Sequence, residues 1–146
     1  MVFETDHAPK SIVIPQSVDA TPVTGVIDTV GYNQLCIEFF LDVAAPSSVI
    51  TVMAVSESDT TSGFTAIAAL TNGTGANNFT PIVPNLSNPD IVEMQIDLRG
   101  RKRYLQVSLA STTARLAAVL GILGRAEIGV GSTAPGQPGV TQIVQA

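Results

Sequence analysis

Residues 35–43, with the sequence LCIEFFLDV, alternate between two kinds of side chain with a period of two. One set is apolar throughout and comprises Leu35, Ile37, Phe39, Leu41 and Val43. The other set includes the acidic Glu38 and Asp42. Because successive side chains of a β-strand point to opposite faces, the stretch predicts a strand with one buried face. A helical spacing of apolar residues fits it less well.

Further strand patterns lie on both sides of this stretch. They occur at residues 11–14, 23–29, 49–55, 64–67, 92–98 and 105–109. Residues 49–55 are apolar on both faces, which predicts a strand in the middle of a sheet or at a subunit contact. Residues 114–123 are rich in Ala and Leu, which favour helix, but Gly121 and Gly124 and the short length favour a strand.

About eight strands with regular turns and no clear helix predict an all-β fold, an antiparallel β-sandwich of the jelly-roll type. We expect one such domain over residues 11–128, preceded by an extended N-terminal arm over residues 1–10. Residues 129–146 are expected to form a Gly/Pro-rich C-terminal tail. Residues 70–89 carry no charge and should form an ordered long loop or a short hairpin.

The end of the tail, residues 140–144, regains strand character and includes Ile143 and Val144. Two interpretations stay open. The segment adds a strand to a neighbouring subunit, or it is a frayed terminus.

The composition points to a surface with few charges. Charged residues make up 13% of the 146-residue chain, about half the usual share, and the net charge is −5. Either large surfaces are covered by other proteins, or the surface is a neutral one of Ser, Thr and Asn. The acidic balance argues against direct nucleic-acid binding. No apolar stretch reaches membrane-spanning length and the N-terminus does not resemble a signal peptide, so we expect a soluble, cytoplasmically made protein.

Residues that carry chemistry are scarce. The single histidine, His7, precedes the first predicted strand, and the single cysteine, Cys36, falls in an apolar run typical of a small buried thiol. No pair of residues has the spacing of a zinc or calcium site. Glu57 and Asp59 lie two apart before a turn, where acids more often face solvent than form a site. We therefore expect no enzyme activity, no cofactor and no metal.

A basic run, Arg99, Arg101, Lys102 and Arg103, precedes Tyr104 at the start of a predicted strand. It has three interpretations, which we rank in order: a turn held in solvent, a protein interface that meets acidic groups of a neighbour, and a nucleic-acid patch.

Three segments together carry a resemblance. Residues 28–32 (DTVGY), residues 56–59 (SESD) with GFT at 63–65, and residues 100–105 (GRKRYL) resemble, in order and spacing, small structural proteins of tailed bacteriophages. The resemblance spans residues 23–123. It implies a jelly-roll domain that decorates or cements a capsid shell, often as a trimer.

The resulting prediction is a virion structural protein that binds the outside of a phage capsid and stabilises contacts between capsomers. Its expected partners are the phage major capsid protein and itself, with a homotrimer favoured, and its expected place is the capsid surface after synthesis in the bacterial host cytoplasm. Two alternatives are a receptor- or carbohydrate-binding jelly-roll module and a head–tail or tail component. The candidate interface residues are Arg99, Arg101, Lys102, Arg103, Tyr104, Ile143 and Val144.

Overall fold

A computed structural model describes residues 7–43, 48–73, 75, 78–80, 89–125 and 142–145. Within these ranges the chain forms nine strands and no helix. The strands are β1 (His7–Val18), β2 (Val23–Asp28), β3 (Gln34–Leu41), β4 (Ile50–Ser58), β5 (Thr65–Thr71), β6 (Asp90–Asp97), β7 (Tyr104–Ser111), β8 (Arg115–Gly124) and β9 (Gln142–Gln145). All eight strands predicted between residues 11 and 123 are present.

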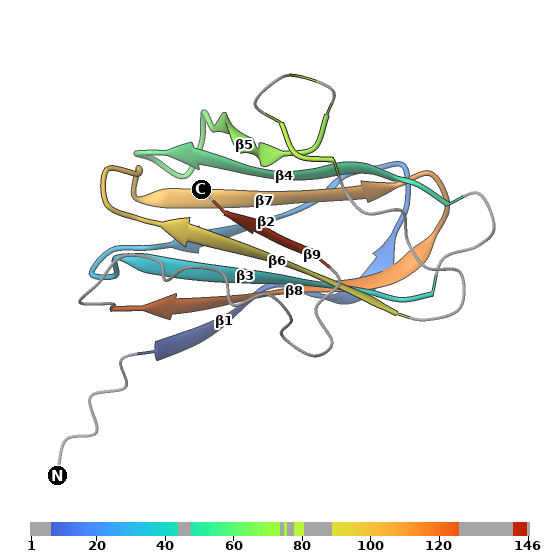
Figure 1. Ribbon diagram of the computed structural model, residues 1–146, viewed down its shortest axis with the longest axis horizontal. Helices are drawn as coiled ribbons and strands as arrows, with labels where there is room; N and C mark the ends of the chain where they lie inside the picture. The colour runs from blue at the N-terminus through green and yellow to red at the C-terminus, as the bar shows by residue number, and fades with distance from the viewer. Residues whose placement is uncertain are drawn as a thin grey trace, which may run out of the picture.

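The strands form two sheets that face each other (Figure 1). The first sheet has the order β1-β8-β3-β6-β9 and the second has the order β2-β7-β4-β5. The pairs β1–β8, β2–β7, β3–β6 and β4–β5 are all antiparallel, as in one long hairpin folded across itself with β4 and β5 at its tip. This arrangement confirms the predicted antiparallel sandwich of the jelly-roll type.

The core lies between the sheets and follows the alternation in the sequence. Leu35, Ile37 and Phe39 of β3 are fully buried. Their neighbours in the core come mainly from the central strands: Met53, Val55, Met94, Ile96, Leu105, Val107 and Leu109. Because β3, β6, β4 and β7 each present every second residue inward, the two sheets close over a continuous apolar layer.

One position of the quoted stretch departs from the prediction. The strand ends at Leu41, and Val43 is 41% exposed instead of buried. The side chain of Asp42 accepts a hydrogen bond from the backbone N–H of Val43 at 2.7 Å. This local bond turns the chain away from the sheet.

The first strand begins earlier than predicted. Residues from His7 to Lys10, which we expected to belong to an N-terminal arm, pair with β8 residues from Gly124 to Gly121. Residues 7–10 pair there with backbone groups at the edge of β8 that would otherwise be unpaired. This requirement of the edge cannot be read from the sequence of residues 7–10.

A bulge in β1 brings two backbones together. The register shifts between Ser11 and Val13, which leaves Ile12 outside the regular pairing. A Cβ atom at Gly25 of β2 would lie 2.1 Å from the carbonyl oxygen of Ile12. Only glycine leaves room for this approach, through which β1 of the first sheet contacts β2 of the second.

The C-terminal segment also departs from the predicted tail. Residues 142–145 form β9, which runs parallel to β6 in the same chain, and the side chain of Val144 is 8% exposed. These residues therefore belong to the sandwich. Residues 126–141 lie outside the described part, as does most of the predicted loop at 70–89, in which Asn72 and Phe79 form an isolated bridge.

Candidate functional site

The basic run lies in the turn between β6 and β7. Leu98 accepts a hydrogen bond from the backbone N–H of Arg101 at 3.0 Å, which closes the turn, and Gly100 takes a positive φ of 83°. A glycine at the third position of a turn is the usual way to adopt that angle. Because the turn is tight, the side chains of residues 99–103 spread outward in several directions.

Each basic side chain of the run meets an acidic side chain of the same molecule. Arg99 bonds to Asp97 through both Nε and Nη2, and Arg103 bonds in the same bidentate way to Asp28, with Nε–Oδ1 at 2.9 Å and Nη2–Oδ2 at 2.6 Å. The two remaining pairs are looser: Arg101 Nη1 lies 3.9 Å from Glu57 Oε1, and Lys102 Nζ lies 3.6 Å from Asp59 Oδ2.

These pairs neutralise the run and leave a turn of mixed charge. The hydrogen bonds from Arg99 lower the pKa of Asp97 to about 2, and those from Arg103 lower the pKa of Asp28 below its usual value. Both carboxylates therefore stay ionised well into the acid range. A nucleic-acid patch would need uncompensated positive charge, so the arrangement counts against that interpretation.

Three segments that were singled out in the sequence, residues 28–32, 56–59 and 100–105, approach one another at this end of the sandwich. Thr29 donates a hydrogen bond from Oγ1 to the carbonyl oxygen of Arg103 at 2.7 Å, and Glu57 accepts one from the backbone N–H of Lys102 at 3.3 Å. Asp28 and Thr29, Glu57 and Asp59, and residues 101–103 thus lie together in one polar cluster. Of the candidate residues, Tyr104 completes it, because the guanidinium of Arg103 stacks over the Tyr104 ring at 4.8 Å.

The other two candidate residues, Ile143 and Val144, lie in β9 at the edge of the first sheet. Ile143 pairs by register with Glu93, and Val144 pairs with Met94. The candidate residues therefore form two separate groups, one at the β6–β7 turn and one on the β6 edge.

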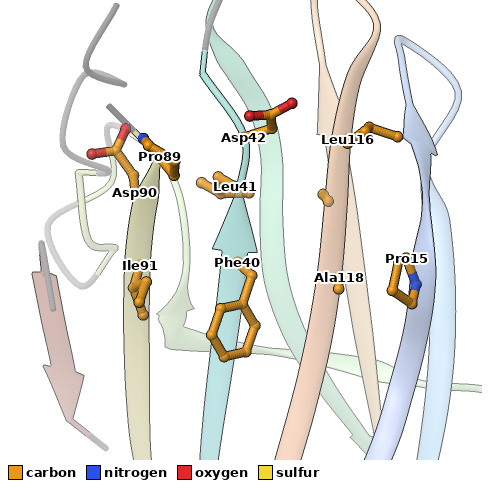
Figure 2. A pocket seen from close by; sticks show the side chains of 10 residues that line it. Pro15, Phe40, Leu41, Asp42, Pro89, Asp90, Ile91, Leu116 and Ala118 are labelled. Atoms are coloured by element: carbon orange, nitrogen blue, oxygen red, sulfur yellow. The ribbon is translucent and has the colours of Figure 1, made fainter. Parts of the chain in front are cut away.

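An apolar depression on the outer face of the first sheet was not identified from the sequence. It has a volume of about 330 Å³ and is lined mainly by Pro15, Phe40, Ile91, Leu116 and Ala118 (Figure 2). These residues come from the four adjacent strands β1, β3, β6 and β8. Phe40 is 37% exposed and Leu116 is 59% exposed.

We call the five side chains that mainly line this depression the apolar patch: Pro15, Phe40, Ile91, Leu116 and Ala118. The available signal was the doublet Phe39-Phe40, because two consecutive aromatic residues in a strand must point to opposite faces. An exposed apolar patch on a soluble protein typically marks an interaction site.

Acidic residues border the patch, and a buried arginine lies beside them. Asp42 and Asp90 line the depression at one end. Arg115, 5% exposed, donates a hydrogen bond from Nη2 to the backbone carbonyl of Asp42, while its Nε and Nη1 have no hydrogen-bond partner among the described residues. Burial lowers the pKa of Arg115, and the charges of Asp90 and Asp42 oppose this effect. The guanidinium thus offsets the negative charge at the border of the patch.

A second cluster on this outer face contains Cys36, Glu38 and Glu93, whose ligand atoms lie within 4.8 Å of one another. Burial, followed by the charges of the two carboxylates, raises the pKa of the Cys36 thiol to about 12. The thiol is therefore protonated at neutral pH and is a poor nucleophile. Gln95 donates a hydrogen bond to Glu93 at 2.5 Å, so the amide occupies one carboxylate oxygen.

Neither a search for membrane-spanning helices nor comparisons with known proteins point to a function. Within the described ranges there is no helix long and apolar enough to span a membrane. No protein-family model, no curated protein and no solved structure matches this chain.

Proposed function

We propose that this protein is a non-enzymatic structural component of a tailed-phage virion that binds the outside of the capsid and stabilises contacts between capsomers. The observation that carries the proposal is the apolar patch on the outer face of the first sheet. Phe40 and Leu116 are exposed side by side on this face, and a contiguous exposed apolar surface typically marks a contact with another protein.

The polar end of the molecule supports the proposal in a second way. The ion pairs at the β6–β7 turn leave side chains that can form charge-assisted hydrogen bonds, but little net charge to attract nucleic acid. This suits contact with a protein surface of mixed charge. The likeness of the three turn segments to phage structural proteins supplies the class of partner, the major capsid protein, and favours a homotrimer.

Burial alone supplies the binding energy in this proposal. Covering a large apolar side chain completely is worth about 1.5–3 kcal/mol, so the exposed part of Leu116 contributes about 1 kcal/mol per copy. Symmetric repetition multiplies this small term over the shell. No catalytic group and no cofactor enter the proposed action.

The test is binding to undecorated phage heads, followed by heating of the particles. The wild-type chain should bind and raise the temperature at which heads release DNA. Leu116→Lys should reduce binding at least tenfold, because about 1 kcal/mol of burial is lost and an ammonium group must enter an apolar contact.

The matched control is Val26→Lys. Val26 is 46% exposed on the outer face of the second sheet, so the same substitution changes the net charge equally but leaves the apolar patch intact. Normal head binding by Val26→Lys together with loss by Leu116→Lys supports the proposal. Equal effects of the two substitutions, or no binding by the wild-type chain to heads that lack decoration, would overturn it.

A further inference from the structure

The outer edge of β6 is covered by the C-terminal strand of the same chain. Residues Val92 to Gln95 pair in parallel with residues Gln142 to Gln145. β9 also contacts β5 of the opposite sheet, and the side chain of Val144 is buried. The strand therefore closes the side of the sandwich where β6 and β5 would otherwise be open.

This edge needs a partner strand. Unpaired backbone groups on an exposed edge attract other strands, and natural proteins cover such edges. β9 supplies backbone hydrogen-bonding groups along the edge, and Val144 supplies one apolar side chain to the core. Any segment with the same four residues meets these needs equally well, whether it comes from the same molecule or from a second copy.

The connection to β9 is much longer than the path requires. β8 ends at Gly124, which pairs with Gln34 of β3, and Gln34 pairs in turn with Asp97 of β6. β9 begins at Gln142, which pairs with Val92 of β6. Three strand spacings across the sheet and five residues along it give a separation of roughly 22 Å. The 16 residues 126–141 can span about 50 Å when extended. The chain length is therefore sufficient to reach the β6 edge of an adjacent molecule.

From these observations we infer that the β6 edge of one copy accepts residues 142–145 of a neighbouring copy when copies are held side by side, in the same register as within one chain. The inference concerns contacts between copies and does not rest on capsid binding. A linker of this length gives an effective concentration on the order of millimolar within one chain. Isolated molecules thus keep β9 on their own sheet, and exchange sets in where the local concentration of neighbours is comparable, as in an oligomer.

Disulfide trapping tests this inference directly. Gln95 and Gln145 are Cα partners in adjacent strands, about 4.8 Å apart, which is within the range that a disulfide bridges. In a Cys36→Ala background, Gln95→Cys and Gln145→Cys are made as separate chains. The two are unfolded and refolded together, concentrated until they are oligomeric, and oxidised. A non-reducing gel then reports disulfides between different chains.

The control uses Gln142→Cys in place of Gln145→Cys. Gln142 pairs with Val92, about 10 Å along the strand from Gln95, so a disulfide in register cannot form. Each single variant oxidised alone shows the background from pairs of identical cysteines. Exchange predicts a covalent dimer for the Gln95→Cys and Gln145→Cys mixture, at several times the yield of the control mixture.

A double variant with Gln95→Cys and Gln145→Cys in one chain distinguishes exchange between chains from pairing within one chain. Exchange predicts covalent oligomers at high concentration and an internal disulfide at high dilution. Only internal disulfides at every concentration, or a chain that stays monomeric throughout, would overturn the inference. Head binding is measured separately on the same variants, so the loss of either result leaves the other interpretable.

Discussion

Replacement of Gly25 by alanine should destabilise the protein through a backbone clash. The new Cβ atom would lie 2.1 Å from the carbonyl oxygen of Ile12 and 2.8 Å from its carbonyl carbon. A carbon and a carbonyl oxygen in contact are normally about 3.3 Å apart, so β1 or β2 must move by roughly 1 Å. Rotation of the Ile12 side chain moves its Cγ2 atom, which is also 2.8 Å away, but leaves the two backbone atoms at the β1 bulge in place.

The magnitude follows from two opposing effects. Overpacking of this kind costs about 1–3 kcal/mol, and a rigid backbone obstruction belongs at the upper end. The loss of glycine freedom in the unfolded chain returns about 0.4–1 kcal/mol. The net loss in unfolding free energy is about 2 kcal/mol, which lowers the melting temperature by about 4–8 °C for a chain of this size.

The assay is urea unfolding followed by circular dichroism, with Gly63→Ala as the control. Gly63 has a φ of +67°, and a Cβ atom added there would have no heavy atom within 4 Å, so alanine meets only backbone strain, worth about 1 kcal/mol. Gly25→Ala should therefore be the more harmful substitution. If it is as stable as wild type, or no less stable than Gly63→Ala, the close approach of Ile12 to Gly25 is not a feature of the folded protein.

Three further outcomes are expected. Gly121→Ala places its Cβ 2.8 Å from Ile12 Cδ1 and 3.0 Å from Ile27 Cδ1, both at the movable ends of side chains, so the loss in unfolding free energy should stay below about 1 kcal/mol. Ile12→Val, which lacks Cδ1, should recover part of this loss in a double-mutant cycle. The folded-state pKa values of Asp28 and Asp97 lie below the ordinary 3.8, so their contribution to stability is present above pH 3.8 and is lost as the pH falls toward 2. Asp28→Asn should therefore flatten the acidic part of a plot of urea midpoint against pH. An unchanged slope would contradict the ion pair with Arg103. The pKa of Cys36 is raised from 9.0 to about 12, so the folded protein loses stability as the pH rises above 9. Cys36→Ala should remove this part of the loss. If the thiol reacts with a disulfide reagent equally fast in native and unfolded protein at pH 8, Cys36 is not buried.

The strands could be predicted from the sequence because each carries its own evidence. The alternation of residues 35–41 follows from one buried face. Residues 114–123 form the strand β8 in spite of their alanines, and Gly121 lies at a position of close packing. The ends of the chain were predicted less completely. Residues 7–10 become part of a strand because they cover the edge of β8, which is a property of the sheet and not of those residues. Residues 140–144 have strand character in the sequence, but the sequence does not show that residues 142–145 pair with β6 of the same chain.

The candidate site was predicted in part. The basic run and the acids Glu57 and Asp59 were noticed separately, but their pairing depends on the turns after β4 and β6 lying at the same end of the sandwich. The apolar patch was missed, because its members, among them Phe40, Ile91 and Leu116, come from strands far apart in the chain and become neighbours only through the sheet order.

The long-hairpin arrangement of the strands also bears on how the chain folds. β4 and β5 are separated by a few residues, whereas β1 and β8 pair residues that are on the order of a hundred positions apart, and each doubling of a closed loop adds about 0.6 kcal/mol of entropy. Pairing is therefore expected to start at the β4–β5 tip and to proceed toward the termini. Such a sequence-distant sheet folds slowly, on the millisecond-to-second scale. The edge of β8 then stays open longest, and during this interval a partly folded copy presents that edge to the strands of neighbouring copies.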